Sequence, residues 1–540
     1  MRGVDPRDAL LVAGLLTWAT ALVAIRFGYV QSPPGGTKGT QALTYGVPLA
    51  LVALTLLHRP SRTSALPLVA GAAAAVALAL LLPSHLNASP KYALVVPAAV
   101  VGAYLTNRYP TTSLALIFLI TGTYGSIKAF TGIPADSVTD KIIDGVWAGI
   151  VGRLLVGRRG LTVRPTPALL MLGAFLGITI IAVFTTSSLA NGIRAFRLAP
   201  LFLSMVLVIG YGGFGRRTLM LLARAMVVVS LLVAAYAALR WAIGTSGQEQ
   251  ALQKTAFERQ YNRIATSNDL KVQGSLPNGS LLGLWLACTI PLQVAAAISW
   301  RGIFRWFALA GLPLAVIGLL GSAQRGAAAA VVAGGLTIIV VHVLSRGSRG
   351  PRLGVAVGAA VVLIASAVVA YPAVLNNPQK RARYANLLTP SQDEPFQERL
   401  TKWRTTLTTL KGRPFGYGLG AGDPGVIPHR FADVAYYTID NSFLMIAYDQ
   451  GIAAMIVFAI AMLLLLVELL RHAVWTRGPD SSVLSAAAAG TLVAMLIEFM
   501  TANFVATPPV VAGWMVVGLG VAQLGRAAAR PAPQVAAVTP

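Results

Sequence analysis

Long apolar runs separated by short polar gaps extend along the whole 540-residue chain. A helix needs about 20 predominantly apolar residues to cross the hydrocarbon core of a bilayer, and by this measure the pattern predicts roughly 16 spans. They lie at 8–27, 43–57, 66–83, 92–106, 112–127, 142–157, 167–187, 198–214, 220–243, 278–299, 304–321, 326–345, 354–373, 452–470, 481–503 and 508–525. The pattern therefore predicts an all-α polytopic membrane protein, a multi-helix transmembrane bundle.

The charged residues are few, and their distribution predicts an orientation. The chain is 56% hydrophobic and 11% charged, with a formal net charge of +25. Basic residues concentrate in alternate gaps, for example at 153–164, 301–305 and 346–352. An excess of Lys and Arg on short loops is typical of the cytoplasmic side. We therefore expect these gaps and both termini to be cytoplasmic, and we expect no nucleic-acid partner.

Two polar segments are longer than the other gaps, and this topology puts both outside the membrane. Loops beyond about 12–15 residues usually have a function, so the chemistry is expected there. The predicted organisation is N-terminal transmembrane helices at 1–243, an external loop at 244–277, transmembrane helices at 278–373, a long external loop with active-site residues at 374–441, C-terminal transmembrane helices at 442–525 and a disordered cytoplasmic tail at 526–540.

Residues 396–410 of the long loop are predicted to form an amphipathic helix. Its apolar stripe follows helical spacing. The stripe consists of Phe396, Leu400, Trp403, Leu407 and Leu410. Arg399 and Arg404 flank this stripe, so the helix either anchors on lipid headgroups or binds an anionic substrate. The rule that places positive charge inside does not account for arginines on the outer face.

A glycine-rich segment follows this helix. Gly416, Gly418 and Gly420 stand at alternate positions, outside any βαβ context. Glycine allows positive φ and a close approach of the backbone to a ligand. The segment is either a flexible loop or part of a binding site.

The residues Asp440-Asn441-Ser442 precede the next apolar segment. Asp440 could be the N-cap of a helix. An acid beside the outer surface, with arginines upstream, could instead act as a general base. The residue types leave both interpretations open.

Two further outer-face positions carry polar residues. Lys271 and Asn278 lead into a span, and Arg325 stands between two apolar runs with little polar cover. An arginine at such a depth costs a few kcal/mol on insertion, so it either faces a partner or cavity or snorkels to the interface. Because guanidinium groups bind phosphate through two hydrogen bonds, the arginines together suggest an anionic lipid headgroup, such as a polyprenyl diphosphate or a phospholipid.

These residues form an ordered series of motifs. The motifs are Lys271-x-x-Gly274 with Pro277-Asn278, then Ser322-x-x-Arg325-Gly326, Arg399-x-x-x-Trp403, Pro414-Phe415-Gly416-x-Gly418-x-Gly420 and Asp440-Asn441-Ser442-Phe443-Leu444. Their order, spacing and membrane side resemble the O-antigen ligase and O-antigen polymerase superfamily, over roughly residues 260–525. The N-terminal part resembles it only as a series of spans.

The resemblance implies a membrane glycosyltransferase of the GT-C type, without a cofactor or metal ion. Such an enzyme transfers a glycan from a polyprenyl-diphosphate donor to an acceptor glycan at the outer face of the bacterial cytoplasmic membrane, in contact with membrane lipids. The resemblance further implies that Arg325 and Arg399 hold the diphosphate. Asp440 stands where ligases of the family carry histidine, and an aspartate at this position is more similar to the exopolysaccharide polymerases. In such a polymerase Asp440 would activate the acceptor hydroxyl. Lys271 stands where the family has arginine.

The resemblance also suggests substrate-binding residues around these three catalytic candidates. They are Arg404, Lys271, Arg263, Asn278, Asn441, Gly416, Gly418, Gly420 and Trp403. The sequence therefore favours a polysaccharide polymerase.

Three alternatives remain. One is a ligase that delivers finished glycan to a lipid, protein or wall acceptor. Another is a peptidoglycan polymerase of the shape, elongation, division and sporulation family, whose loop pattern is not evident here. The third, from another class, is a polyprenyl-lipid transporter or flippase. A transporter should carry charges near mid-membrane, whereas the spans here have almost none, and the exceptions Asp449 and Glu498 lie near outer ends.

Overall fold

The computed structural model describes residues 109–131, 166–186, 192, 195–196, 203–244, 246–247, 249, 271–345, 394–421, 439–476, 479–502 and 507–528. The chain divides into two compact units, one of residues 1–117 and 132–161 and the other of residues 118–131 and 162–540. The first unit lies almost entirely outside the described residues. The architecture below is that of the second.

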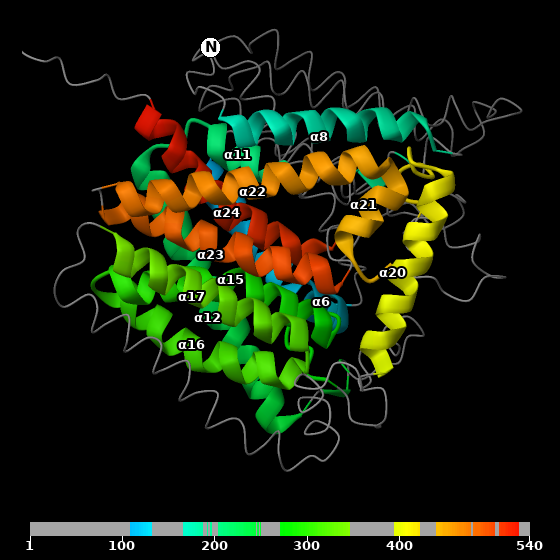
Figure 1. Cartoon of the computed structure of the whole chain (residues 1–540). Helices are drawn as coiled ribbons and strands as arrows, with labels where there is room; N and C mark the ends of the chain where they lie inside the picture. Colours follow the sequence, from blue (N-terminus) through cyan, green and yellow to red (C-terminus); the bar gives the residue numbers. More distant parts are fainter. Residues whose placement is uncertain are drawn as a thin grey trace, which may run out of the picture. The chain divides into compact units, whose positions relative to one another are not determined.

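All regular elements of the described residues are helices (Figure 1). They are α6 (Pro110–Thr131), α8 (Pro167–Phe184), α11 (Met205–Tyr211), α12 (Arg216–Ile243), α15 (Gly279–Ser299), α16 (Ile303–Ser322), α17 (Arg325–Leu344), α20 (Glu394–Gly412), α21 (Ser442–Gln450), α22 (Ile452–Trp475), α23 (Pro479–Thr501) and α24 (Pro508–Ala528).

Seven of these helices are long and apolar enough to cross a membrane. This confirms the predicted fold class of an α-helical polytopic membrane protein. The bounds of α15, α16 and α17 agree with the predicted spans to within one residue. The predicted spans at 8–27, 43–57, 66–83, 92–106, 142–157 and 354–373 lie outside the described residues. The short helix α21 was not predicted as a separate element.

Helix α15 is the centre of the bundle. It packs against α16, α17, α23 and α24, and nearly all of its side chains are buried. Trp285 and Leu286 are fully enclosed. A helix that is apolar on all sides is stable only when other helices surround it. The sequence of α15 is apolar on all sides, and its position at the centre of the bundle surrounds it with other helices.

Small residues allow α17 and α23 to pack closely. A Cβ atom on Gly334 would lie 2.6 Å from the carbonyl oxygen of Gly490, which is too close for any side chain. Without a hydrophobic driving force between helices in lipid, small residues permit the close contacts that hold the helices together. The Ala- and Gly-rich stretch at 326–335, which contains Gly334, thus allows α17 to lie close to α23.

The outer faces of the bundle are strongly apolar. Large side chains such as Ile181, Trp306 and Leu463 are more than half exposed. A soluble protein rarely shows apolar side chains over so much of its surface. These faces are suited to contact with lipid tails, as expected for spans.

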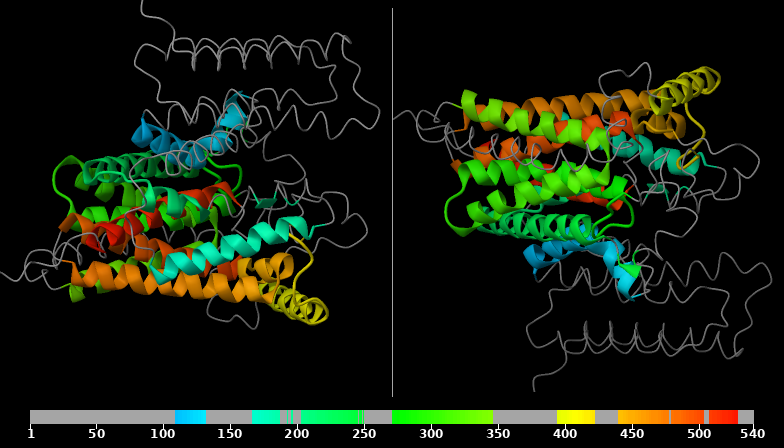
Figure 2. Two further views of the ribbon diagram at one scale, coloured as in Figure 1. Left: turned by 90° about the horizontal axis from the view of Figure 1, so that it is seen from above. Right: turned by 90° about the horizontal axis from the view of Figure 1, so that it is seen from below.

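The two ends of the bundle differ in their residues. At one end, which we call the site end, the end of α16 meets the segment before α15, and the start of α17 meets the end of α23. Helix α20 lies at this end of the bundle (Figure 2), and it runs across the ends of the other helices in the view of Figure 1. The opposite end carries Arg216 and Arg217 at the start of α12, Arg301 and Arg305 around the start of α16, and Arg471 near the end of α22.

Candidate active site

Helix α20 begins and ends within two residues of the predicted 396–410 helix. Trp403 packs against Ile439, Leu444 and Met445, and Leu410 is buried. Leu407, predicted as part of the same apolar stripe, is 50% exposed and so does not pack closely against the protein. Thr406 and Leu410 are buried and Trp403 is partly buried. Leu407 lies about 40° beyond Trp403, at the edge of this face of the helix.

Asn441, and not Asp440, is the N-cap of α21. The Asn441 side-chain oxygen accepts hydrogen bonds from the backbone N–H groups of Phe443 at 2.9 Å and Leu444 at 3.0 Å. This arrangement satisfies two N–H groups that the helix start leaves without partners. The capping interpretation of Asp440 is therefore wrong, and its carboxylate lies one residue before the cap.

Asp440 pairs instead with α20. Its Oδ2 atom lies 3.7 Å from Nε of Arg399, and the two side chains are 30% and 33% exposed. Charge-assisted hydrogen bonds of this kind are usually about 2.7–2.9 Å long, so the pair is loose. The structure thus brings together two residues that are far apart in sequence and were both predicted to be catalytic.

Several groups act on the carboxyl group of Asp440. Burial raises the pKa of Asp440 above its ordinary value, and this effect is the largest. The positive charges of Arg399 and Lys402 lower it, and the negative charge of Glu398 raises it. The net result is a carboxyl group with a raised pKa, which brings it closer to the pH at which a general base works best.

The start of α21 is fastened to the end of α23. The Asn441 amide donates to the carbonyl oxygen of Met500 at 3.3 Å, and the Ser442 hydroxyl donates to that of Ala502 at 2.9 Å. These bonds fix the position of Asp440 relative to the spans. A residue on a loop is thereby held by rigid helices, as precise chemistry requires.

Arg325 is the first residue of α17, directly after a tight turn from α16. Ala323 in this turn has φ +52° and is fully buried. It is the one non-glycine residue with positive φ among those described. Such a conformation costs free energy and persists only where surrounding contacts enforce it, often at functional sites. The turn fixes Arg325 at the site end, where its side chain is partly buried.

Lys271 lies beside the same turn. The backbone N–H of Val272 donates to the carbonyl oxygen of Gly321 at 3.1 Å. A Cβ atom on Gly279 would lie 2.8 Å from that of Lys271, so this segment packs tightly at the start of α15. Asn278 caps α15 by accepting from the N–H of Leu281 at 2.8 Å. Like Asn441, Asn278 therefore has a capping role that the sequence interpretation missed.

The glycine-rich segment wraps around the end of α21. Gly416, Gly418 and Gly420 all have positive φ, between 81° and 99°. The N–H of Gly418 donates to the backbone oxygen of Asp449, and the N–H of Gly420 donates to its carboxylate at 2.9 Å. A Cβ atom on Gly416 would lie 2.7 Å from the nitrogen of Gly451. These glycines make close contacts within the chain, and their contact with a ligand stays a prediction.

The remaining predicted site residues are less closely tied to the pair. Arg404 lies on the exposed side of α20, and Trp403 is partly buried beside α21 with its indole N–H buried and unpaired among the described residues. Arg263 lies outside the described residues. The structure thus joins Asp440 directly to Arg399 and holds Arg325 and Lys271 together at a neighbouring turn.

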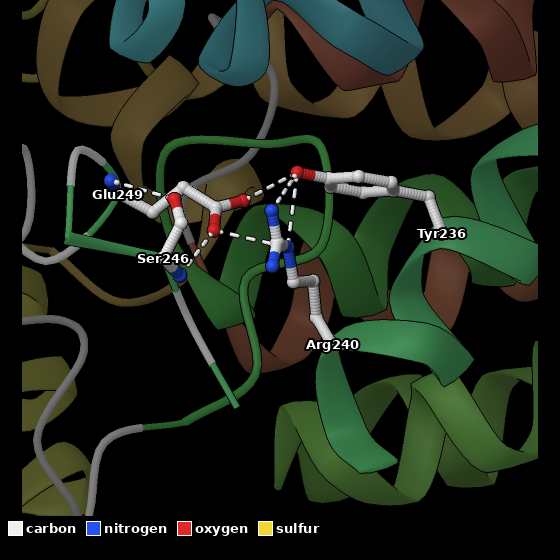
Figure 3. Close-up of polar contacts among 4 residues, drawn as sticks. All are labelled: Tyr236, Arg240, Ser246 and Glu249. Atoms are coloured by element: carbon white, nitrogen blue, oxygen red, sulfur yellow. Dashed lines mark hydrogen bonds and ion pairs between the residues drawn. The ribbon is translucent and has the colours of Figure 1, made fainter. Parts of the chain in front are cut away.

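A second charged cluster, which the sequence interpretation missed, lies at the end of α12 (Figure 3). Glu249 lies 3.0 Å from Nε of Arg240 and accepts from the hydroxyl of Tyr236 at 2.7 Å and from the N–H of Ser246 at 2.7 Å. Both oxygens of this carboxylate are used, and Glu249 is buried. The i, i+4 spacing of Tyr236 and Arg240 was a sequence signal that these two side chains meet on α12. The acidic partner, Glu249, could not be inferred in this way because it comes from the loop that follows the helix.

A family model described as O-Antigen ligase matches residues 309–459. The match contains Arg325, Arg399 and Asp440, and it ends before Glu498. It is shorter than the region over which the motifs suggested a resemblance. A comparison with curated proteins found no match. Residues 309–459 of the chain are therefore similar to the O-antigen ligase family of membrane glycan-transfer proteins.

Proposed function

We propose that this protein is a polysaccharide polymerase that joins glycan units supplied on a polyprenyl diphosphate. The observation that carries the proposal is the Asp440–Arg399 pair, a partly exposed carboxylate 3.7 Å from a partly exposed guanidinium group. Glycan transfer from a diphosphate needs a base for the acceptor and positive charge for the leaving group. The pair offers both within one contact distance.

The proposed reaction is a direct displacement. The Asp440 carboxylate accepts the proton of an acceptor hydroxyl, whose oxygen attacks the anomeric carbon of the donor glycan. The bond between that carbon and the phosphate oxygen breaks, and the polyprenyl diphosphate leaves with the electron pair. Attack from the opposite face inverts the anomeric configuration.

The arginines have a separate task in this reaction. Negative charge grows on the diphosphate as it leaves, and Arg399 and Arg325 would stabilise that charge with hydrogen bonds and positive charge. Arginine suits this task better than lysine because its planar group donates two parallel hydrogen bonds to phosphate. Lys271, beside the Arg325 turn, would add a point charge.

The external face is the proposed side of the reaction. Five arginines gather around the opposite ends of the same helices, which is the distribution typical of the cytoplasmic side. The site end would then face outward, where a lipid-linked donor is accessible from the outer leaflet. We propose the bacterial cytoplasmic membrane as the location.

A ligase is the second candidate, because the matching family model is described as O-Antigen ligase. The chemistry at the anomeric carbon would be the same, and only the acceptor would differ. In a ligase the acceptor is a separate lipid, protein or wall glycan. In a polymerase it is another lipid-linked unit.

One experiment separates these functions. The purified protein in lipid is incubated with a polyprenyl-diphosphate oligosaccharide, and glycan length and released polyprenyl diphosphate are measured for wild type, Asp440→Asn and Arg325→Ala. Glu398→Gln, assayed at a pH above the acid fall of the pH–rate profile, serves as the control, since this acid lies on α20 but is 63% exposed and pairs with Lys402.

We expect a ladder of longer glycans from wild type and Glu398→Gln, and none from the other two variants. Diphosphate release only after a separate acceptor is added would establish a ligase. No turnover with any polyprenyl donor would contradict glycan transfer and favour the transporter interpretation.

A further inference from the structure

Helix α20 and the residues that follow it carry exposed side chains that the proposed reaction does not use. Leu407 is 50% exposed, and Phe415, three residues beyond the end of the helix, is 89% exposed. The basic residues Arg404, Lys411 and Arg413 are exposed as well. We call these five residues the exposed edge. Exposed apolar side chains mixed with basic ones are typical of a helix that lies on an anionic membrane surface.

The exposed edge lies beside the face of α20 that packs on α21. Leu407 lies about 40° from Trp403 around the helix axis, at 100° per residue. Lys411 and Arg404 lie about 80° and 100° from Trp403 in the same direction. Arg399 lies about 40° from Trp403 in the opposite direction. Helix α20 therefore directs its site residue Arg399 to one side and the exposed edge to the other.

The backbone places Phe415 at the level where a span begins. The carbonyl oxygen of Pro414 accepts a hydrogen bond at 2.9 Å from the N–H of Ile452, the first residue of α22. A Cβ atom on Gly451 would lie 2.9 Å from the Cα atom of Phe415. Helix α22 is long and apolar enough to cross a membrane, and Ile456 near its start is 48% exposed. Phe415 therefore lies where α22 would enter the bilayer, the depth at which interfacial segments bury aromatic side chains.

The orientation of α20 suits a membrane surface. Figure 1 shows α20 running across the ends of the spanning helices, and both views of Figure 2 show it at the edge of the bundle. A helix that crosses the ends of spans lies along the surface of the bilayer. Among the described helices, α20 packs extensively only against the short helix α21. The described helices therefore leave the exposed edge open to lipid headgroups.

The charge of this segment selects the kind of surface. The sequence 399–421 contains five basic residues and no acidic one. Arg399 lies beside Asp440, and Lys402 pairs with Glu398. The other three basic residues belong to the exposed edge. Basic side chains near a membrane are attracted to the phosphates of anionic lipids, so the charge of the edge complements an anionic bilayer.

We propose that the exposed edge docks on an anionic phospholipid surface at the site end of the bundle. Leu407 and Phe415 enter the boundary between headgroups and acyl chains, and the three basic residues of the edge contact lipid phosphates. Because the same helix carries Arg399, docking sets the height of that residue relative to the membrane surface. The docking involves lipid alone and does not depend on the proposed reaction.

Fluorescent labels at single positions test the docking. Cys288 is the only cysteine of the chain and is buried, so Cys288→Ala gives a background in which one new cysteine takes the label. The full-length variants Leu407→Cys, Phe415→Cys and Thr405→Cys are labelled and placed in nanodiscs that contain phosphatidylglycerol. Thr405 is the matched control, because it is exposed on the same helix and lies about 160° from Leu407. Quenching is measured with nitroxide-labelled lipids and with iodide in the water.

We expect nitroxide lipids to quench the labels on Leu407→Cys and Phe415→Cys, and iodide to quench the label on Thr405→Cys. If iodide quenches the Leu407→Cys label as strongly as the Thr405→Cys label, the edge lies in water and the docking is wrong. Protection of the Leu407→Cys label from both quenchers would also overturn it, because another protein surface or a second copy of the chain would then cover the edge.

A second comparison tests the selection of anionic lipid. The Leu407→Cys label is measured again in phosphatidylcholine nanodiscs, and in phosphatidylglycerol nanodiscs after Arg404→Gln and Lys411→Gln together, with thermal unfolding recorded to show that each variant is folded. The ratio of docked to undocked helix should fall by about fivefold for each basic residue removed. Equal lipid quenching in neutral and anionic nanodiscs would overturn the proposal. None of these measurements requires glycan transfer, so their failure would leave the proposed function untouched.

Discussion

Two carboxylate–guanidinium pairs lie at the site end of the bundle, and they are built very differently. In the Arg240–Glu249 pair the atoms are 3.0 Å apart, and both oxygens of a buried glutamate have partners. In the Arg399–Asp440 pair the atoms are 3.7 Å apart and both side chains are about a third exposed. The first pair is closed and ties a loop to α12, whereas the second is open to a ligand.

From this difference we propose that the open pair, and not the closed one, takes part in the reaction. A fully satisfied buried network fixes the structure around it, and breaking it costs stability. A loose pair whose side chains are about a third exposed contributes little to stability, because solvent screens exposed charges. The charges of the open pair are therefore available to a substrate. The predictions that follow test whether activity and stability separate between the two pairs as this account requires.

The largest expected effect is the loss of turnover in Asp440→Asn. A positioned base contributes about 10²–10⁴-fold to the rate, and the amide cannot accept the proton. The steady-state rate of glycan transfer should fall by a factor in that range. A variant with more than a tenth of wild-type activity would contradict the role of Asp440 as base.

The same variant should not lose stability. Because burial raises the pKa of Asp440 in the folded protein, the ionised carboxylate is less favourable in the folded state than in the unfolded state, and it disfavours folding at pH values above that raised pKa. A neutral amide removes this unfavourable contribution. The thermal midpoint of Asp440→Asn at neutral pH should equal or exceed that of wild type.

Loss of one guanidinium group should have the next largest effect on activity. Removing a single donor that stabilises charge in the transition state typically lowers the rate by about 10²–10³-fold. Arg399→Ala and Arg325→Ala should both show such a loss, with Arg399→Lys recovering only a part of it. Full recovery by lysine would mean that only charge, and not the paired hydrogen bonds, is needed.

Glu249→Gln should show the opposite behaviour. Removing one partner of a buried ion pair costs about 3–5 kcal/mol of folding free energy. We expect a lower thermal midpoint and an unchanged rate for the protein that stays folded. A large loss of rate in folded Glu249→Gln would show that the closed pair also belongs to the active site.

The smallest expected effect is a shift in pH dependence. The rate should fall as the pH drops through the pKa of Asp440, because the protonated carboxyl group cannot act as a base. Lys402 lowers that pKa, so Lys402→Ala should move this fall to higher pH. A fall that moves to lower pH, or does not move, would indicate that another group controls the rate. The matching variant Glu398→Gln should move the fall the other way, because Glu398 raises the same pKa.

The sequence predicted the spans and α20 well, for a physical reason. The bilayer demands a minimum apolar length, and amphipathic spacing reports the buried side of a surface helix, so both are visible in a single chain. The exception is Leu407, which lies at the edge of the face of α20 that packs against α21 and is half exposed. Which side of a helix meets protein and which meets lipid cannot be read from an apolar stripe alone.

The finer details of the site depended on packing between distant segments. Asp440 and Asn441 are equally good capping residues in sequence, and only the contact of Asn441 with Met500 and of Asp440 with Arg399 separates them. The glycines at 416, 418 and 420 fit a ligand loop by pattern, yet Gly416 packs closely against residues 449–451 and Gly418 against residues 185–186. Glu498 was visible as an unusual acid, but its place beside Gly326 of α17 was not.

The most direct test of the account separates donor binding from catalysis at the open pair. The equilibrium Kd of the glycan-loaded polyprenyl diphosphate is measured for wild type, Asp440→Asn and Arg399→Ala, together with single-turnover transfer at saturating donor. We predict that Asp440→Asn binds the donor as tightly as wild type without transferring glycan, while Arg399→Ala binds it more weakly. If Asp440→Asn loses donor binding in proportion to its loss of transfer, Asp440 is not the base for the acceptor, and the division of tasks within the pair is wrong.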